Sequence, residues 1–192
     1  MTGSDMRAFF ALNPPPEILA HTERFLSQNK EIFGRGIRWV KINQIHLTLK
    51  FYRAFAVDDI HPIRNSMRAE LINLDFSELR IQGGGCFPNN RKSRIIWLGL
   101  NPTHGIKKVV EIIESVSESY GYQKDKRTFN PHLTIGRVKK HASAVEKDLI
   151  AKSIPTLRHY ESEPFQFSRI RLVQSTLTPA GPIYKDVFEL RF

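Results

Sequence analysis

The chain has 192 residues, 41% of them hydrophobic and 25% charged, which is typical of a folded globular protein and excludes a disordered or fibrous one. Its length allows a sizeable buried core, and its single cysteine, Cys86, excludes an intrachain disulfide framework and fits a reducing compartment. The 29 Lys and Arg residues exceed the 19 Asp and Glu residues, and the net charge of +10 favours an anionic partner such as a nucleic acid or a nucleotide.

The start of the chain, residues 1–6, has neither the basic end nor the apolar core of a signal peptide. Nowhere do about 18 apolar residues follow one another, as a membrane-spanning helix would require. We therefore expect a soluble, cytoplasmic protein without a membrane partner.

The first part of the chain shows apolar runs typical of strands and two helical patterns. Strands are predicted at residues 7–13, 37–40 and 45–52. A helix is predicted at residues 16–33, after the prolines that end the first strand. A second helix is predicted to begin with Asp58 as its N-cap. Its apolar residues repeat at helical spacing, at Ile60, Ile63, Met67 and Leu71.

The second part of the chain continues this mixture. Strands are predicted at residues 79–82, 94–100, 129–138, 165–172 and 184–192. An apolar stripe predicts a helix over residues 106–116, and Ser143 with Glu146 forms a capping-box pattern ahead of a helix that ends near residue 154. The glycines at 83–85 predict a loop or bulge in which Cys86 has a structural role. Because strands often follow one another directly, residues 1–192 are predicted to form one α+β domain with antiparallel sheet.

One short sequence occurs twice. His46-Leu-Thr-Leu49 is repeated as His132-Leu-Thr-Ile135, 86 residues later, and both copies fall within predicted strands. The separation is too long for a solenoid repeat, so we expect two half-domains that each supply one copy to a shared site.

Each copy presents an imidazole and a hydroxyl on one face of its strand, because residues i and i+2 point the same way. His46 with Thr48, and His132 with Thr134, would therefore face the site while the aliphatic residues anchor the strand in the core. Two facing histidines can supply an acid and a base to one phosphorus, and the threonine hydroxyls can hydrogen-bond its oxygens. A single His-x-Thr is most simply structural, whereas the paired copies favour catalysis.

Paired motifs of this form in a chain of this length resemble the two-histidine (2H) phosphoesterase superfamily, and within it the RNA 2′,3′-cyclic phosphodiesterases, formerly called 2′-5′ RNA ligases. Other segments that resemble the family span nearly the whole chain: residues 7–12, Trp39, residues 94–100, residues 131–137, and residues 175–177 with Gly181 and Tyr184. The chain departs from the family after Phe51, where Tyr52 and Arg53 replace an aliphatic residue and a glycine.

The resemblance implies a bilobal fold of two pseudo-symmetric, intertwined lobes, each with an antiparallel sheet and helices outside, and an active site in the central groove. It also implies that Phe51 stacks on a nucleobase and that Arg137 lies near the phosphate end of the substrate. Both residues follow their histidine by five positions, so strict alternation puts them on the opposite face of the strand. They reach the site only if each strand ends, twists or bulges there.

The implied reaction opens a 2′,3′-cyclic phosphate end of RNA, or of a nucleotide, to a 2′-phosphate by metal-independent acid–base catalysis without a cofactor. By analogy His132 is the base and His46 the acid, although the pseudo-symmetric motifs permit either assignment. Thr48, Thr134 and Arg137 would stabilise the phosphate charge. Nothing in the sequence requires more than a monomer.

No metal site is expected. The other histidines fall at no metal-ligand spacing, and Asp58 and Asp59 beside His61 are explained as acids at a helix start.

Three alternatives stay open. The first is a phosphodiesterase of the same superfamily that cuts 2′-5′ oligonucleotides or another cyclic nucleotide. The second is a non-catalytic RNA- or nucleotide-binding module. The third is a general basic RNA-binding protein, although its basic clusters at 91–94, 124–127 and 139–140 are most simply solvated loop charges. If the groove exists, residues 124–127 could guide RNA toward His132.

Overall fold

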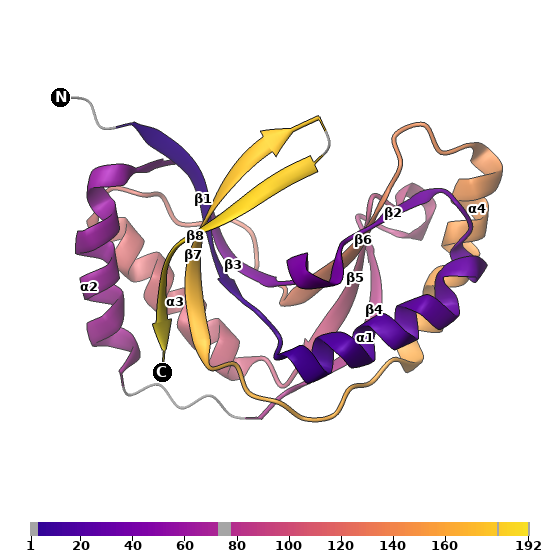
Figure 1. Ribbon diagram of the computed structural model, residues 1–192, viewed down its shortest axis with the longest axis horizontal. Helices are drawn as coiled ribbons and strands as arrows, with labels where there is room; N and C mark the ends of the chain where they lie inside the picture. The colour runs from indigo at the N-terminus through magenta and orange to yellow at the C-terminus, as the bar shows by residue number, and fades with distance from the viewer. Residues whose placement is uncertain (1–3, 73–77, 180, 192) are drawn as a thin grey trace.

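The computed structural model describes residues 4–72, 78–179 and 181–191 and shows one curved, eight-stranded antiparallel sheet flanked by helices (Figure 1). The strands are β1 (Asp5–Leu12), β2 (Ile37–Trp39), β3 (Leu47–Ala56), β4 (Arg80–Phe87), β5 (Ile95–Asn101), β6 (His132–Val138), β7 (Arg169–Thr178) and β8 (Gly181–Arg191). The α-helices are α1 (Pro16–Asn29), α2 (Ile60–Leu71), α3 (His104–Ser119) and α4 (Ala144–Ser153). Short 3-10 turns are η1 (Lys30–Phe33), η2 (Ile42–Gln44), η3 (Val57–Asp59), η4 (Asn90–Lys92) and η5 (Ile154–His159). The predicted α+β class with antiparallel pairing is confirmed.

The sheet consists of two groups of strands that meet at a single pair of residues. One group has the order β4-β5-β6, with β2 also paired to β6, and the other has the order β3-β1-β7-β8. The two groups join where Leu47 of β3 pairs with Leu133 of β6. Both strands that carry a histidine motif therefore lie at the junction.

The helices are divided between the two groups of strands. Figure 1 shows α2 and α3 together on one side of the molecule, and α1 and α4 on the other. The predicted stripe on α3 is confirmed, since Ile106, Val109 and Ile113 are fully or almost fully buried in the core. Within the described residues, no helix is both long enough and apolar enough to pass through a membrane.

Several predicted boundaries shift. The helix predicted at 16–33 is α1 followed by η1, the strand predicted at 129–138 begins only at His132, and the strand predicted at 165–172 begins at Arg169. The last predicted strand begins earlier, at Gly181, and its residue 192 lies outside the described residues. The loop or bulge predicted at 83–85 is a bulge within β4, but it lies at Gln82 and Gly83, between the paired residues Ile81 and Gly84, and Gly84 and Gly85 pair regularly with β5.

Of the two predicted helix caps, one is right. Ser143 and Glu146 form the capping box of α4: the Glu146 amide donates to Ser143 Oγ (3.2 Å), and the Ser143 amide donates to Glu146 Oε2 (2.8 Å). The prediction that Asp58 caps the second helix is wrong. Asp59 occupies that position without a side-chain cap, and its Oδ2 instead accepts a hydrogen bond from the Tyr122 hydroxyl (2.6 Å).

Candidate active site

The pairing of Leu47 with Leu133 brings the two motifs together. Both leucines are fully buried, so the residues on either side of each point to the other face of the sheet. When this antiparallel register is extended by one residue each way, His46 lies opposite Thr134 and Thr48 lies opposite His132. Strand spacing and rise then put the Cα atoms of the two histidines roughly 8 Å apart on a diagonal. We call this side of the sheet the histidine face.

The two imidazoles are held in the same way. His46 Nδ1 lies 2.7 Å from the carbonyl oxygen of Gln44, and His132 Nδ1 lies 2.7 Å from the carbonyl oxygen of Asn130. A carbonyl only accepts, so in the neutral ring Nδ1 carries the proton and Nε2 has a free lone pair. In each motif the backbone two residues upstream therefore selects the tautomer whose Nε2 can accept or, once protonated, donate.

Aromatic rings surround both histidines. The His46 ring stacks on Phe9, with centroids 4.8 Å apart, and Tyr184 meets its edge at 5.6 Å. The His132 ring is met edge-on by Phe87 at 5.0 Å and by Trp97 at 6.4 Å. These contacts limit rotation of both imidazoles, which a site for directed proton transfer requires.

A β-bulge places Phe51 on the histidine face. On β1, Phe10 pairs with Lys50 and Ala11 pairs with Thr48, so Leu49 has no partner on that strand. The extra residue reverses the alternation that follows it. Phe51 then pairs with Phe9, the ring that stacks on His46, and remains 41% exposed with the Arg7 guanidinium 4.7 Å above it.

A bulge at the matching position places Arg137 on the same face. On β5, Ile96 pairs with Gly136 and Trp97 pairs with Thr134, which leaves Ile135 without a partner there. Gly136 consequently faces the core, where an added Cβ would lie 2.8 Å from Ile37 Cγ2, and Arg137 turns outward. Each unpaired residue is the third after its histidine, so both motif strands carry the same irregularity.

The first bulge has a cost, since it turns Lys50 inward. The Lys50 side chain is 4% exposed, and its Nζ donates to Glu114 Oε2 of α3 (2.5 Å) and to the carbonyl oxygen of Gln123 (2.9 Å). A buried ammonium is tolerated only when paired in this way. The pair thus anchors the bulge that displays Phe51.

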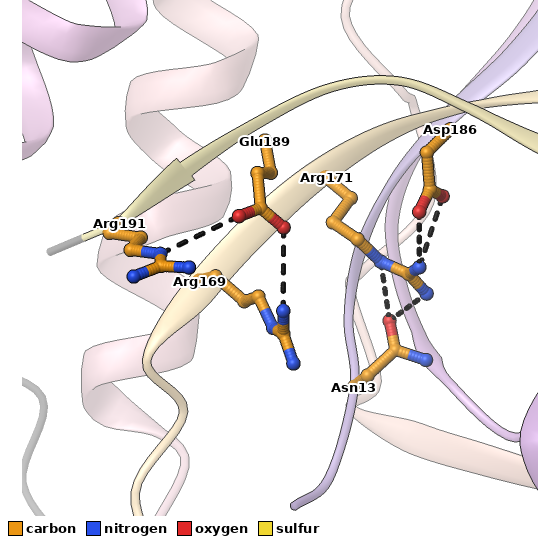
Figure 2. Close-up of polar contacts among 6 residues, drawn as sticks. All are labelled: Asn13, Arg169, Arg171, Asp186, Glu189 and Arg191. Atoms are coloured by element: carbon orange, nitrogen blue, oxygen red, sulfur yellow. Dashed lines mark hydrogen bonds and ion pairs between the residues drawn. The ribbon is translucent and has the colours of Figure 1, made fainter.

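Sequence reasoning missed a further cation, Arg171 of β7. It pairs with Ala11, which pairs with Thr48, so Arg171 also lies on the histidine face. Figure 2 shows its guanidinium held by both carboxylate oxygens of Asp186 (3.0 and 2.7 Å) and by Oδ1 of Asn13, which Nε meets at 3.0 Å. The Asn13 amide in turn donates to the carbonyl oxygen of Ile45, the residue before His46 (3.2 Å). No sequence motif near Arg171 predicts its position on the histidine face, because that position depends on the order of the strands.

The electrostatic environment of His46 disfavours its charged form. Burial lowers the pKa of His46 below its ordinary value of 6.5, and the positive charges of Arg171 and Arg137, with that of a protonated His132, lower it further. The hydrogen bond to the Gln44 carbonyl acts in the opposite direction. The ring of His46 is therefore mostly neutral at pH 7. The charges of His132 and Arg137 affect the pKa of His46 because both residues lie close to its ring.

Other potential ligand groups are structural. Cys86 is buried beside Asn90 and Ser93, and its Sγ lies 3.2 Å from Asn90 Oδ1, as expected for a packed thiol. Across residues 4–72, 78–179 and 181–191, no three His, Cys, Asp or Glu side chains gather closely enough to hold a metal ion.

Comparisons with known proteins agree on one family. The family model described as the 2′-5′ RNA ligase superfamily matches residues 39–178. A relative from Methanothermobacter thermautotrophicus, named RNA 2′,3′-cyclic phosphodiesterase, is 31% identical over 95% of this chain and 96% of its own length. A relative of the same name from Methanocaldococcus jannaschii is 32% identical, over 96% and 99% respectively.

Solved structures share the fold. A Thermus thermophilus protein superposes with a TM-score of 0.75 at 24% identity, over 97% of both chains. Escherichia coli LigT, solved in complex with 3′-AMP, superposes with a TM-score of 0.73 at 18% identity, over 97% of this chain and 98% of its own.

Proposed function

The chain belongs to the 2′-5′ RNA ligase superfamily of two-histidine phosphoesterases, and we propose that it is an RNA 2′,3′-cyclic phosphodiesterase that opens cyclic phosphate ends to 2′-phosphates. The observation that carries the proposal is the arrangement of the two imidazoles. His46 and His132 lie on one face of the sheet, and each has its Nδ1 engaged by a backbone carbonyl. Two Nε2 atoms are thereby left to act on opposite sides of one phosphorus.

Hydrolysis needs one proton acceptor and one proton donor. Water attacks the phosphorus in line with the 3′-oxygen, a new P–O bond forms, and the bond from phosphorus to the 3′-oxygen breaks. His132 Nε2 takes the proton of the water, and His46 Nε2 gives a proton to the departing 3′-oxygen. The products are a 2′-phosphate and a free 3′-hydroxyl, and each proton transfer contributes about 10²–10⁴-fold to the rate.

The acid role of His46 requires the substrate. Because burial and, in addition, the charges of Arg171 and Arg137 lower the pKa of His46, its ring is mostly neutral in the free protein. A bound phosphodiester carries a negative charge that offsets these arginines and favours the imidazolium form. Protonation of the acid is thus coupled to occupation of the site.

The remaining residues of the histidine face bind the substrate and stabilise the charge on its phosphate. The hydroxyls of Thr48 and Thr134 donate to the non-bridging phosphate oxygens, and Arg137 and Arg171 stabilise the charge that grows on them. Phe51 with Arg7 offers the terminal base an aromatic ring and a planar cation. Base stacking of this kind is tolerant of sequence.

Catalysis without a metal, a cytoplasmic location and a monomeric state are part of the same proposal. Two titratable rings supply the acid and the base, so no metal-bound water is needed. The basic charge and the single cysteine support a reducing, nucleic-acid-containing compartment.

The test is turnover of a 2′,3′-cyclic mononucleotide, and of an oligoribonucleotide with a cyclic end, in the presence of EDTA. His46→Ala and His132→Ala should each lower kcat by about 10²–10⁴-fold. His61→Ala, an exposed histidine of α2, is the matched control and should retain full activity. Activity that survives in both motif variants would contradict the mechanism. Cleavage of 2′-5′ linkages without hydrolysis of cyclic ends would assign the protein to the alternative substrate class.

A further inference from the structure

A strongly basic cavity opens next to Arg137. Its volume is about 1050 Å³, and its lining includes eight Lys or Arg side chains and no Asp or Glu. We call it the basic cleft. Eight cations around one cavity, with no acidic side chain in its lining to offset them, favour an anionic ligand over a neutral one.

Strand pairing gathers this charge from four parts of the chain that the sequence keeps apart. Arg38 of β2 pairs with Arg137 of β6, which also pairs with Ile95 of β5. The turn before β5 adds Arg91, Lys92 and Arg94. The segment after β6 adds Lys139 and Lys140, and α4 adds Lys147. Figure 1 shows β2, β6 and α4 on the same side of the molecule.

These cations are available to a ligand. All eight are exposed, and none forms an ion pair within the part of the chain that the structure describes. The basic segment at 124–127 differs, because Lys124 pairs with Glu118 (2.7 Å). Unpaired cations that line one cleft repel one another, and a polyanion that binds there releases its counterions.

Arg137 connects the cleft to the histidines. It lines the cleft, and it also lies close enough to His46 and Tyr184 for its positive charge to act on both side chains. From His132 to Arg137 the strand rises by about 16 Å, so a ligand that extends from the histidines past Arg137 into the cleft is longer than a single phosphate.

We propose that the basic cleft binds the sugar-phosphate backbone of a single RNA strand whose 3′ cyclic end lies between His46 and His132. The inference rests on the proposed function and makes oligonucleotides its preferred substrates over free cyclic nucleotides. The 5′-ward part of the strand runs past Arg137 into the cleft. Its phosphates, not its bases, are recognised, so the contribution is independent of sequence.

The experiment compares two charge-reversed proteins with matched net charge. Lys140→Glu with Lys147→Glu alters the cleft, and Lys107→Glu with Lys108→Glu alters two exposed lysines of α3 that do not line it. Binding of a fluorescent oligoribonucleotide that ends in a 2′-phosphate is measured by anisotropy over a range of salt concentrations. Turnover is measured on an oligoribonucleotide and on a mononucleotide, both with 2′,3′-cyclic ends.

The cleft variant should bind the oligonucleotide roughly tenfold more weakly at 0.1 M salt, and its salt slope should fall by about 1.4, or 0.7 for each lost phosphate contact. Its kcat/KM should fall for the oligonucleotide and stay unchanged for the mononucleotide. Equal binding by the two charge-reversed proteins would overturn the inference. Because binding is read without turnover, a protein inactive on both substrates would refute the proposed function alone.

Discussion

The buried ion pair behind Phe51 gives the sharpest test of how the site is built. Lys50→Met keeps most of the apolar stem and removes the ammonium, which leaves the carboxylate of Glu114 without its partner. The two side chains are 4% and 13% exposed, so water cannot readily replace the lost contact. Removal of one partner of a buried pair costs about 3–5 kcal/mol of unfolding free energy.

That loss is large enough to measure in a melt. In a chain of this length each kcal/mol lowers Tm by about 2–4 °C, so Lys50→Met should lower Tm by roughly 6–20 °C. The second substitution, Glu114→Leu, should restore most of the stability, because a well-packed apolar pair can replace a buried ion pair at little cost. Chemical denaturation then gives the coupling energy of the double-mutant cycle.

The matched control is Lys152→Met, which removes the lysine of an exposed i,i+4 pair with Asp148. These side chains are 73% and 61% exposed, so the control should lose no more than about 0.5 kcal/mol. If Lys50→Met were as mild as this control, Lys50 would not be the compensated buried charge that the bulge creates. If the double variant were no more stable than Lys50→Met, an uncompensated carboxylate would not be the cause.

Three further outcomes are expected. Phe51→Ala should raise KM for cyclic-phosphate substrates by roughly 5- to 150-fold, the equivalent of about 1–3 kcal/mol of base stacking. Tm should stay nearly unchanged, because Phe51 is 41% exposed. An unchanged KM would mean that Phe51 does not contact the substrate. Arg171→Gln should raise the pKa of His46 toward 6.5, since a positive charge that disfavours the imidazolium is lost. The pKa is measured by NMR titration of the His46 ring. A pKa that stays constant or falls would refute the placement of the Arg171 charge beside His46. Ser143→Ala should cost about 1 kcal/mol through loss of the capping box of α4, measured by chemical denaturation, and Ala144→Ser beside it should cost less; equal losses would mean that the cap does not stabilise the helix.

Local sequence patterns predicted much of the site. The alternation within each motif correctly placed Leu47, Leu49, Leu133 and Ile135 in the core and the histidines and threonines on the other face. The capping box of α4 and the apolar stripe of α3 were also predicted correctly from the sequence. These features depend on residues within one or two turns of one another, where hydrophobic period and hydrogen-bonding side chains act directly.

The same alternation could not place Phe51 and Arg137. Their face is set by bulges, and a bulge is defined by the register against a neighbouring strand, here β1 for Leu49 and β5 for Ile135. Asp58 was misassigned because it lies inside the 3-10 turn η3, which leads directly into α2, so the helix begins later than its local pattern predicts.

The sequence by itself predicted the candidate chemistry: two imidazoles and two hydroxyls at equal spacing, in segments with one apolar face. Only the tertiary structure decided how that chemistry is completed. Strand order placed Arg171 beside His46, the bulges turned Phe51 and Arg137 toward the histidines, and pairing of β2, β5 and β6 gathered distant cations into one cleft. Side-chain type and period are properties of contiguous residues, whereas register and convergence arise only when segments far apart in the chain bury their apolar faces together.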